Sequence, residues 1–393
     1  MREVNDNNSR RAIFAQRLQN ARKICGLSQA ELVAKMEELA MKLPILYKAV
    51  STTAIERYEN GVMFPESDKI LGTLAEVLNT HVSDLLRPFT VKVDCSKFEF
   101  RKKAKLGKKA VEAIKLKIQQ RIEKYVEIER IAGMESSFDT SVLEDVIVSD
   151  AVSARAAANK LRQAWELGVG PIPQPISVLE AHGVKVIEVE EDPFLFDGTS
   201  NMVEGIPVLV LNKKEDTTED GKHLQNEERR RLTLFHELGH QVMRFSEAVT
   251  DKEKEDLCNV FANEMLIPST TFIQIFGAKR ASISYWELKD VQREYGISAR
   301  ALMMKAVQLA VISSNKHKWF CINLNKNVSL RDALDKTAVQ VQHTSRFDRL
   351  VYRSLDSELI THSKAAQLLG ISLNELKSNL NLDIANGYCS KGC

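Results

Sequence analysis

The stretch Arg231-Leu232-Thr233-Leu234-Phe235-His236-Glu237-Leu238-Gly239-His240-Gln241-Val242-Met243 carries the strongest chemical signal in the chain. Its apolar residues recur with the period of a helix, so we expect a helix here. Residues four positions apart lie on one face of a helix, which lets His236 and His240 direct their imidazoles at one metal ion. Glu237 lies on the neighbouring face, where its carboxylate can take a proton from a metal-bound water as a catalytic base.

Two imidazoles and one carboxylate leave a coordination position open for water, which is the arrangement of a catalytic zinc site. We therefore predict one zinc ion per chain. The segment Asp251–Pro268 predicts a second, carboxylate-rich helix shortly after the first. The spacing of its residues does not choose the third ligand among Glu253, Glu255, Asp256 and Glu264.

Two strand-like runs precede this pair of helices. Residues 184–189 and 206–211 are rich in β-branched and apolar residues and are bounded by glycine and asparagine. These runs predict a small sheet. An extended substrate could add to the strand at residues 206–211 through main-chain hydrogen bonds, which we state as a hypothesis.

Residues 151–275 resemble the ImmA/IrrE family of metallopeptidases. The family pairs RxxxTLxHELGH with a downstream ExxANxFAxxLLxP, and this chain has RRRLTLFHELGH, then Glu255–Asn259, Phe261-Ala262 and Leu266-Ile267-Pro268. The resemblance implies a zincin-like α+β domain, an HExxH-type zinc endopeptidase activity and Glu255 as the third ligand. Cys258 stands at the family's usual alanine, and we favour a small buried hydrophobic role over a metal-binding thiolate.

The N-terminal region, residues 8–88, predicts five short helices. A helical pattern runs from Arg11 to Cys25, and Ser28 with Glu31 forms the capping-box signature of a second helix. Ser51 can cap a third helix that ends at Asn60-Gly61. A fourth helix opens at residues 65–68, and a fifth closes the segment near residues 82–86.

This region resembles the helix-turn-helix domain of XRE or Cro/C1-type repressors, which share GLSQxEL, VSxxxIxRxENG and a closing LAxxLxxxxxxLL. The resemblance implies that the helix from Ser51 to Asn60 enters the major groove of a double-stranded DNA operator. The connection Glu37–Ala49, which contains Pro44, is longer than the family's usual tight turn. A helical bundle used for protein contacts or dimerisation is the alternative. The implied DNA-contacting residues are Gln29, Ser51, Thr52, Thr53, Arg57 and Asn60.

Residues 89–150 form a basic connector. Lysines and arginines crowd its first half, and apolar residues from Val111 to Val126 recur at intervals of three and four, so we predict one long amphipathic helix. We favour a solvated face for the charges over an added contact with the DNA backbone. The apolar stripe needs a partner, which is either the next domain or a second copy of the chain in a homodimer. The basic residues include Lys97, Arg101, Lys102, Lys103, Lys105, Lys108, Lys109, Lys115 and Lys117.

Residues 276–393 predict a helical C-terminal region with two hairpins that resemble helix-turn-helix segments. One surrounds Gly296-Ile297-Ser298 and the other surrounds Gly370-Ile371-Ser372. Helix hairpins with such turns are common packing units. We therefore favour structural or substrate-docking roles over further DNA contacts.

Bulk composition sets the remaining bounds. A chain of 393 residues is too long for a single ordinary hydrophobic core, so we expect more than one domain. Its composition, 44% hydrophobic and 27% charged residues, is typical of globular proteins. The formal net charge of +2 is too small to indicate a nucleic-acid-binding protein by itself. The distribution of charge along the chain must decide this point. Six dispersed cysteines favour a reducing compartment. No signal peptide or membrane-length apolar run is evident, so we expect a cytoplasmic protein without a membrane partner.

These features predict a multidomain protein: an all-α helix-turn-helix domain, an α+β zincin-like metallopeptidase domain and a helical C-terminal region. The favoured function is a DNA-binding transcriptional regulator that cleaves a regulatory protein, such as a repressor, an antitoxin or a toxin. The alternative is a transcription factor or antitoxin whose peptidase-like domain acts as a sensor or dimerisation module. The intact set of His236, Glu237 and His240 favours the enzyme, because a sensor has no need of the catalytic base. A housekeeping peptidase with an incidental helical head is a third reading, which the recognition-helix pattern disfavours.

Overall fold

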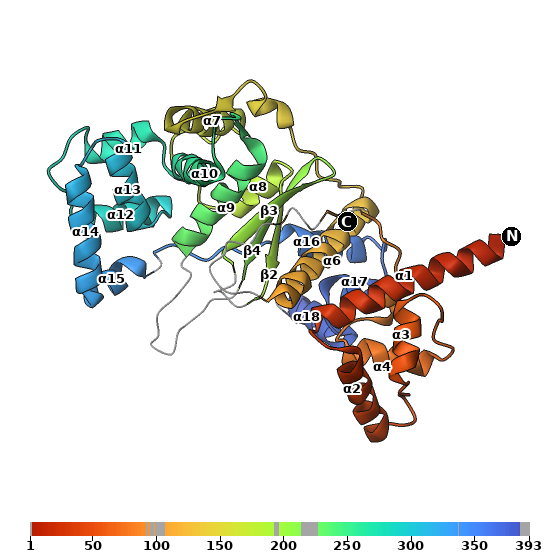
Figure 1. The fold of residues 1–393 in the computed structure, drawn as a ribbon. Coiled ribbons are helices and arrows are strands. Elements are labelled where there is room, and N and C mark those ends of the chain that lie inside the picture. Colours follow the sequence, from red (N-terminus) through yellow and green to blue (C-terminus); the bar gives the residue numbers. More distant parts are fainter. Residues whose placement is uncertain are drawn as a thin grey trace. The chain divides into compact units, whose positions relative to one another are not determined.

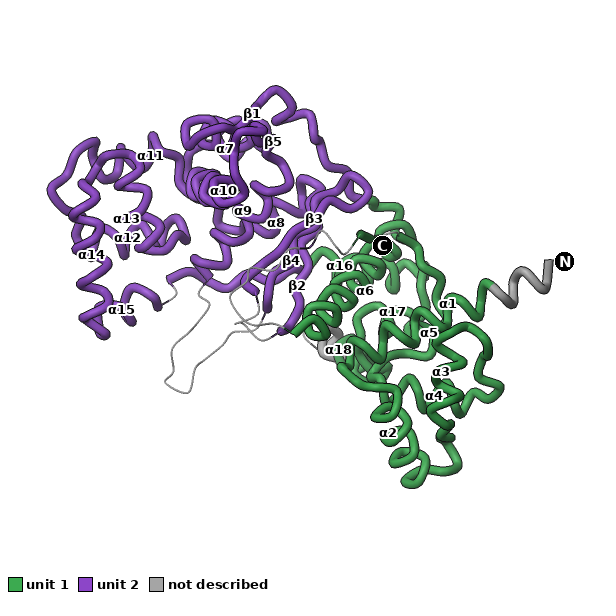
Figure 2. The backbone as a smooth tube through the Cα atoms, viewed as in Figure 1, with its two compact units in different colours: residues 1–95, 105–135, 345–393 green, residues 96–104, 136–344 purple. Residues whose placement is uncertain are grey.

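A computed structural model describes residues 2–91, 93–94, 98, 107–191, 196–213, 227–336 and 338–385. The chain divides into two compact units (Figure 2). Unit 1 combines residues 1–95, 105–135 and 345–393, and unit 2 comprises residues 96–104 and 136–344. The predicted C-terminal region therefore splits at residue 344, because its last helices share a core with the helix Lys108–Ala132 of unit 1. The predicted basic residues Lys97, Arg101, Lys102, Lys103 and Lys105 lie outside the described residues.

Unit 1 begins with five helices, in the order that the sequence predicts (Figure 1 and Figure 2). They are α1 (Arg2–Ile24), α2 (Gln29–Lys42), α3 (Thr52–Glu59), α4 (Asp68–Val77) and α5 (Val82–Leu86). The capping box of Ser28 and Glu31 is confirmed at the start of α2, and the Ser51 hydroxyl caps α3 by accepting from the Ala54 amide. Phe14, Leu18, Leu32, Met36, Ile55 and Leu74 are fully buried between these helices.

The long helix α6 (Lys108–Ala132) supplies the amphipathic element predicted for the connector. Its apolar stripe is buried within unit 1 itself, where α6 packs against α1 and against α16 (Arg346–Asp356). Helices α17 (His362–Leu369) and α18 (Leu373–Ala385) complete this second core, in which Ile128 meets Leu350, Val351 and Leu368. The second C-terminal hairpin is thus a packing element of unit 1.

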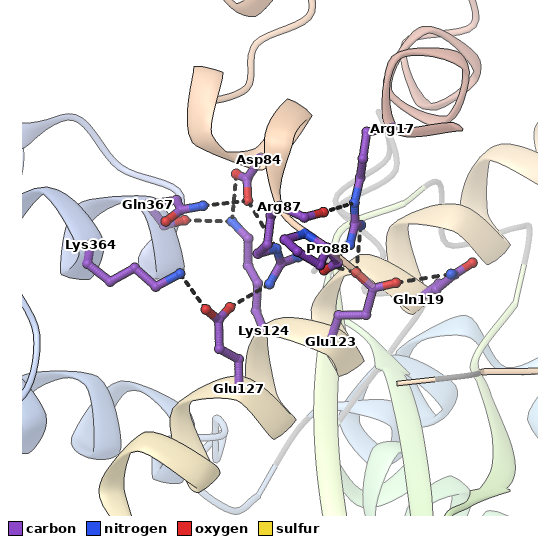
Figure 3. Close-up of polar contacts among 10 residues, drawn as sticks. All are labelled: Arg17, Asp84, Arg87, Pro88, Gln119, Glu123, Lys124, Glu127, Lys364 and Gln367. Carbon is purple, nitrogen blue, oxygen red and sulfur yellow. Dashed lines mark hydrogen bonds and ion pairs between the residues drawn. The ribbon is translucent and has the colours of Figure 1, made fainter. Parts of the chain in front are cut away.

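A network of charged side chains joins the three stretches of unit 1 (Figure 3). Glu123 on α6 is fully buried and accepts from Arg17 at 2.6 Å and from Arg87 at 3.3 Å. Arg87 also reaches Glu127 at 2.6 Å, and Glu127 pairs with Lys364 of α17 at 2.5 Å. Burial makes such ions costly to leave unpaired, so the network requires all three stretches to be in place.

Unit 2 contains a three-stranded sheet of β2 (Lys185–Val189), β3 (Gly198–Val203) and β4 (Ile206–Asn212) in the order β2-β4-β3. Strand β2 runs parallel to β4, and β3 runs antiparallel to it. The two predicted strands are confirmed as β2 and β4, whereas β3 was not predicted. The hypothesis of strand addition to residues 206–211 is wrong, because β4 is the central strand and its main-chain groups already pair on both sides.

Helices surround this sheet in unit 2. Helix α9 (Glu227–Val242) packs on β3 and β4, and α10 (Asp251–Leu266) packs against α9 and α7 (Ala151–Ala164). A two-stranded parallel sheet pairs β1 (Ile147–Val148) with β5 (Arg244–Phe245). No helix among the described residues is long and apolar enough to cross a membrane. The remaining elements are η2 (Thr140–Leu143), α8 (Pro175–Ala181), α11 (Ser269–Phe276), α12 (Tyr285–Tyr295), α13 (Ala299–Gln308), α14 (Ser314–Lys326) and α15 (Val328–Asp335).

The buried network of unit 1 leads to a stability prediction. Replacing Glu123 by Gln removes the negative charge between Arg17 and Arg87, and breaking such a buried pair typically costs roughly 3–5 kcal/mol. We expect hydrogen exchange in α1 and α6 to accelerate accordingly. Glu38→Gln is the matched control, because the Glu38–Lys42 pair is exposed to solvent and should contribute little to stability. Equal exchange protection in the two variants would contradict the structural role of the network.

Candidate metal centre

Helix α9 brings His236 and His240 onto one face, as their spacing predicts. Their Nε2 atoms lie 3.1 Å apart, and the planes of the two rings make an angle of 73°. His236 is buried, whereas the side chain of His240 is 24% exposed. One side of the pair is therefore sealed by the core and the other opens to solvent.

Helix α10 adds one carboxylate to this pair. Glu255 places Oε2 3.3 Å from His236 Nε2 and Oε1 3.1 Å from His240 Nε2. Hydrogen bonds from the two histidines hold the pKa of the Glu255 carboxyl well below its usual range. The carboxylate is therefore ionised, as a metal ligand must be.

The other three candidates for the third ligand, Glu253, Asp256 and Glu264, have different surroundings. Glu253 accepts hydrogen bonds from the backbone and side chain of Thr250 and completes the capping box that starts α10. Asp256 is exposed. Glu264 is buried against Lys305 at 2.6 Å. Of the four candidates, Glu255 alone joins His236 and His240 in a group of potential ligand atoms that all lie within 4.8 Å of one another.

This group fits a tetrahedral metal ion. Metal–nitrogen and metal–oxygen bonds of about 2.0–2.1 Å at tetrahedral angles separate neighbouring ligand atoms by about 3.3 Å. The separations of 3.1–3.3 Å among His236, His240 and Glu255 match that value. The ligand types are those that zinc uses in catalytic sites.

Asn259 orients the first histidine. Its Oδ1 lies 3.0 Å from His236 Nδ1. An amide oxygen only accepts hydrogen bonds, so Nδ1 carries a hydrogen, and Nε2 is the nitrogen that the neutral ring would offer to a metal ion. Sequence reasoning did not single out Asn259. The available signal was its position one helical turn after Glu255, which places both residues on the same face of α10.

Glu237 follows His236 on α9 and contacts β3. Its Oε2 accepts a hydrogen bond of 2.8 Å from the Ser200 hydroxyl, and Gln241 Nε2 donates to the same hydroxyl oxygen at 2.9 Å. Strand β3 comes close because residue 198 is glycine: a Cβ atom there would lie 2.6 Å from Thr233 Cγ2. Ser200 and Gln241 were not predicted, because the contact joins a strand to a helix far along the chain.

Cys258 packs into the interface between α9 and α10. It is fully buried, and its Sγ would lie 3.5 Å from a Cβ atom placed on Gly239. It is not a member of the His236–His240–Glu255 group. This environment agrees with the small hydrophobic role expected from the sequence.

In unit 1, the residues implied to contact DNA lie mostly on the surface. Ser51, Thr52, Thr53, Arg57 and Asn60 are exposed on and around α3. Gln29 differs, because its Nε2 donates to Glu59 at 2.8 Å, and Arg22 binds both oxygens of Glu59 at 2.6 and 2.7 Å. Glu59 thus ties the start of α2 to the end of α3 and fixes the two helices against each other.

Fold and site together define a metallopeptidase-like domain in unit 2. Residues 179–306 match the family model of the IrrE N-terminal-like domain, Peptidase_M78. The matched segment begins in α8, ends in α13 and contains every residue of the candidate centre. No match to a curated protein was found.

The buried pair of Glu264 and Lys305 links α10 to α13 and gives a pH-dependent prediction. Burial, partly offset by Glu264, lowers the pKa of Lys305 to about 8. The unfolded chain, with a lysine pKa of about 10.4, binds more protons than the folded protein above pH 8. Lys305 therefore makes the unfolding free energy of unit 2 rise with pH between about 8 and 10.4.

The double variant Glu264→Gln/Lys305→Met should lack this rise while the rest of the chain titrates as before. Urea unfolding followed by tryptophan fluorescence measures it, because the chain's three tryptophans, Trp165, Trp286 and Trp319, all lie in unit 2. The same pH slope in wild type and double variant would show that Lys305 titrates normally in the folded state.

Proposed function

We propose that the chain is a DNA-binding transcriptional regulator whose unit 2 is a zinc-dependent endopeptidase that cleaves a regulatory protein. The convergence of His236, His240 and Glu255, with Glu237 next to His236 along α9, is the observation that carries the enzymatic half. The three ligands would hold one zinc ion. When bound, zinc acidifies a water molecule and polarises a carbonyl group.

Glu237 is the general base of this proposal. Its carboxylate takes the proton of the attacking water and passes it to the nitrogen of the leaving amine. Ser200 donates to the carboxylate and itself accepts from Gln241, so Glu237 is oriented before a substrate arrives. Asn259 keeps His236 in the tautomer whose Nε2 can act as a ligand.

Strand β3 is the best candidate to receive the substrate. It pairs with β4 on one side only among the described residues, and it carries Ser200 next to Glu237. An extended peptide that adds to β3 would lie beside the catalytic base. The main-chain hydrogen bonds of such an addition suit a protein substrate.

The DNA-binding half of the proposal rests on α2 and α3. Helix α3 presents Thr52, Thr53 and Arg57 to solvent, and these side chains would face the base edges in the major groove. The Glu59 contacts would hold α2 across the sugar-phosphate backbone at a fixed angle to α3. The expected partners are a double-stranded DNA operator and a repressor, antitoxin or toxin as substrate.

Metal content tests the enzymatic half. We expect about one zinc per chain in protein purified without added metal, and its loss in His236→Ala and Glu255→Ala, because each removes a ligand. Asp256→Ala is the matched control, since it removes an exposed carboxylate next to Glu255. Glu237→Gln should keep its zinc and lose peptide cleavage. A wild type that cannot be loaded with zinc would favour the sensor or dimerisation role instead.

The orienting role of Asn259 gives a graded prediction. Asn259→Ala removes the acceptor for His236 Nδ1, and loss of such a partner typically weakens metal binding about 10–100-fold. Asn259→Asp keeps an acceptor oxygen and should retain tight binding. Competition with a zinc chelator measures both affinities. Equal affinity in wild type and the alanine variant would mean that α9 alone orients His236.

A further inference from the structure

A polar cavity in unit 1 has no part in the function proposed above. Its volume is about 440 Å³. Binding sites for small molecules typically have volumes of about 300–1,000 Å³. The walls come from α1, from α4 and α5 with the turn between them, from α6, and from the turn between α17 and α18. All three stretches of chain that build unit 1 therefore bound the cavity.

Four buried charged residues line this cavity. They are Arg17, Asp84, Glu123 and Lys124, which belong to the charged network of Figure 3. Glu123 accepts from Arg17 at 2.6 Å, and Asp84 accepts from the Gln367 amide at 2.9 Å. Both buried carboxylates are thus already engaged by groups of the protein.

The ammonium group of Lys124 keeps one donor for a ligand. An ammonium group has three N–H donors. Within the described part of the chain, its contacts are the Gln367 carbonyl oxygen at 2.6 Å and Asp84 Oδ2 at 3.5 Å. A buried, charged donor without an acceptor is costly, so an acceptor inside the cavity would stabilise the third N–H.

Arg121 contributes a second cation to the lining. It lies three positions before Lys124 on α6, and residues at that spacing are neighbours on one face of a helix. Burial lowers the pKa of Lys124, Asp84 opposes this change, and the charge of Arg121 adds to it. Arg121 is exposed and forms no hydrogen bond or ion pair with any residue that the structure describes. An anion near both cations would relieve their repulsion.

Uncharged polar side chains complete the lining. The side-chain amides of Asn79 and Gln120 line the cavity and form no hydrogen bond with the rest of the described chain. An amide offers both donors and an acceptor, so these groups suit a ligand with polar substituents. A lone ion would leave most of the cavity to water, because one water molecule occupies about 30 Å³.

We propose that this cavity binds a small organic anion. Its carboxylate or phosphate group accepts hydrogen bonds from Lys124 and Arg121. The amides of Asn79 and Gln120 bind its uncharged part. Because the walls come from all three stretches of unit 1, a bound ligand stabilises the state in which these stretches are docked together. The site requires neither zinc nor DNA, so this inference does not rest on the proposed function.

Calorimetric titration of the full chain tests the site with three probes: adenosine monophosphate, succinate and inorganic phosphate. We expect saturable binding of at least one organic probe and weaker binding of inorganic phosphate. Arg121→Gln should weaken binding of the organic probe roughly 10–100-fold, because it removes a charged hydrogen-bond donor. Arg121→Lys keeps the charge and should lose less. The control Lys108→Gln removes a charge from an exposed position of α6 outside the lining and should bind like wild type.

Hydrogen exchange locates the binding within the chain. The bound probe should slow exchange at residues 78–81 and 370–372, which belong to the two turns that line the cavity. Exchange in α14, which belongs to unit 2, should stay unchanged. At the same probe concentration, Arg121→Gln should lose the protection of both turns.

Four results would overturn the proposal. Two of them are a failure of both organic probes to bind and equal binding by wild type and Arg121→Gln. Protection confined to unit 2 would place the binding site elsewhere. Inorganic phosphate that binds as tightly as the organic probes would show that the amides take no part and that the ligand is not an organic molecule. Each of these results leaves zinc binding and peptide cleavage to their own tests.

Discussion

The close approach of α9 and α10 is the constraint on which the metal centre depends. A Cβ atom on Gly239 would lie 3.1 Å from Phe261 Cδ1 and 3.2 Å from Met243 Cε. These distances are tighter than ordinary contact, so a Cβ atom here would require the side chains of Phe261 and Met243 to shift by a few tenths of an ångström. Because glycine lets them meet, Glu255 of α10 reaches both imidazoles of α9, and Asn259 reaches the far nitrogen of His236.

A second close approach positions Glu237, the proposed base. Gly198 allows β3 to pass directly over Thr233, and two residues further on the Ser200 hydroxyl contacts the Glu237 carboxylate. The arrangement of the proposed metal ligands thus depends on a helix pair, whereas that of the proposed base depends on a helix and a strand. Both contacts lie within a well-packed core, where small displacements are resisted by many neighbours.

The sequence predicts the local parts of this centre and misses the tertiary ones. The relation of His236 to His240 follows from helical periodicity, which is a property of one segment. Which of the four carboxylates reaches the histidines depends on which face of α10 is turned toward α9. The spacing of residues along α10 does not determine that orientation. Glu255 was assigned through resemblance alone. Strand β3 escaped detection because glycine, serine and asparagine are poor indicators of a strand.

The same limit applies to unit 1. Helical patterns after residue 345 were recognisable, but nothing local indicated that Lys364 and Gln367 serve a network with Glu127 and Asp84. Those partners are separated by more than two hundred residues of chain, which include the whole metallopeptidase-like domain. Since buried charges are costly without partners, the N-terminal helices reach their final electrostatic balance only after unit 2 has been synthesised and residues 345–385 have docked. Unit 1 therefore cannot complete its fold before residues 345–385 are available, although it contains the first residues of the chain.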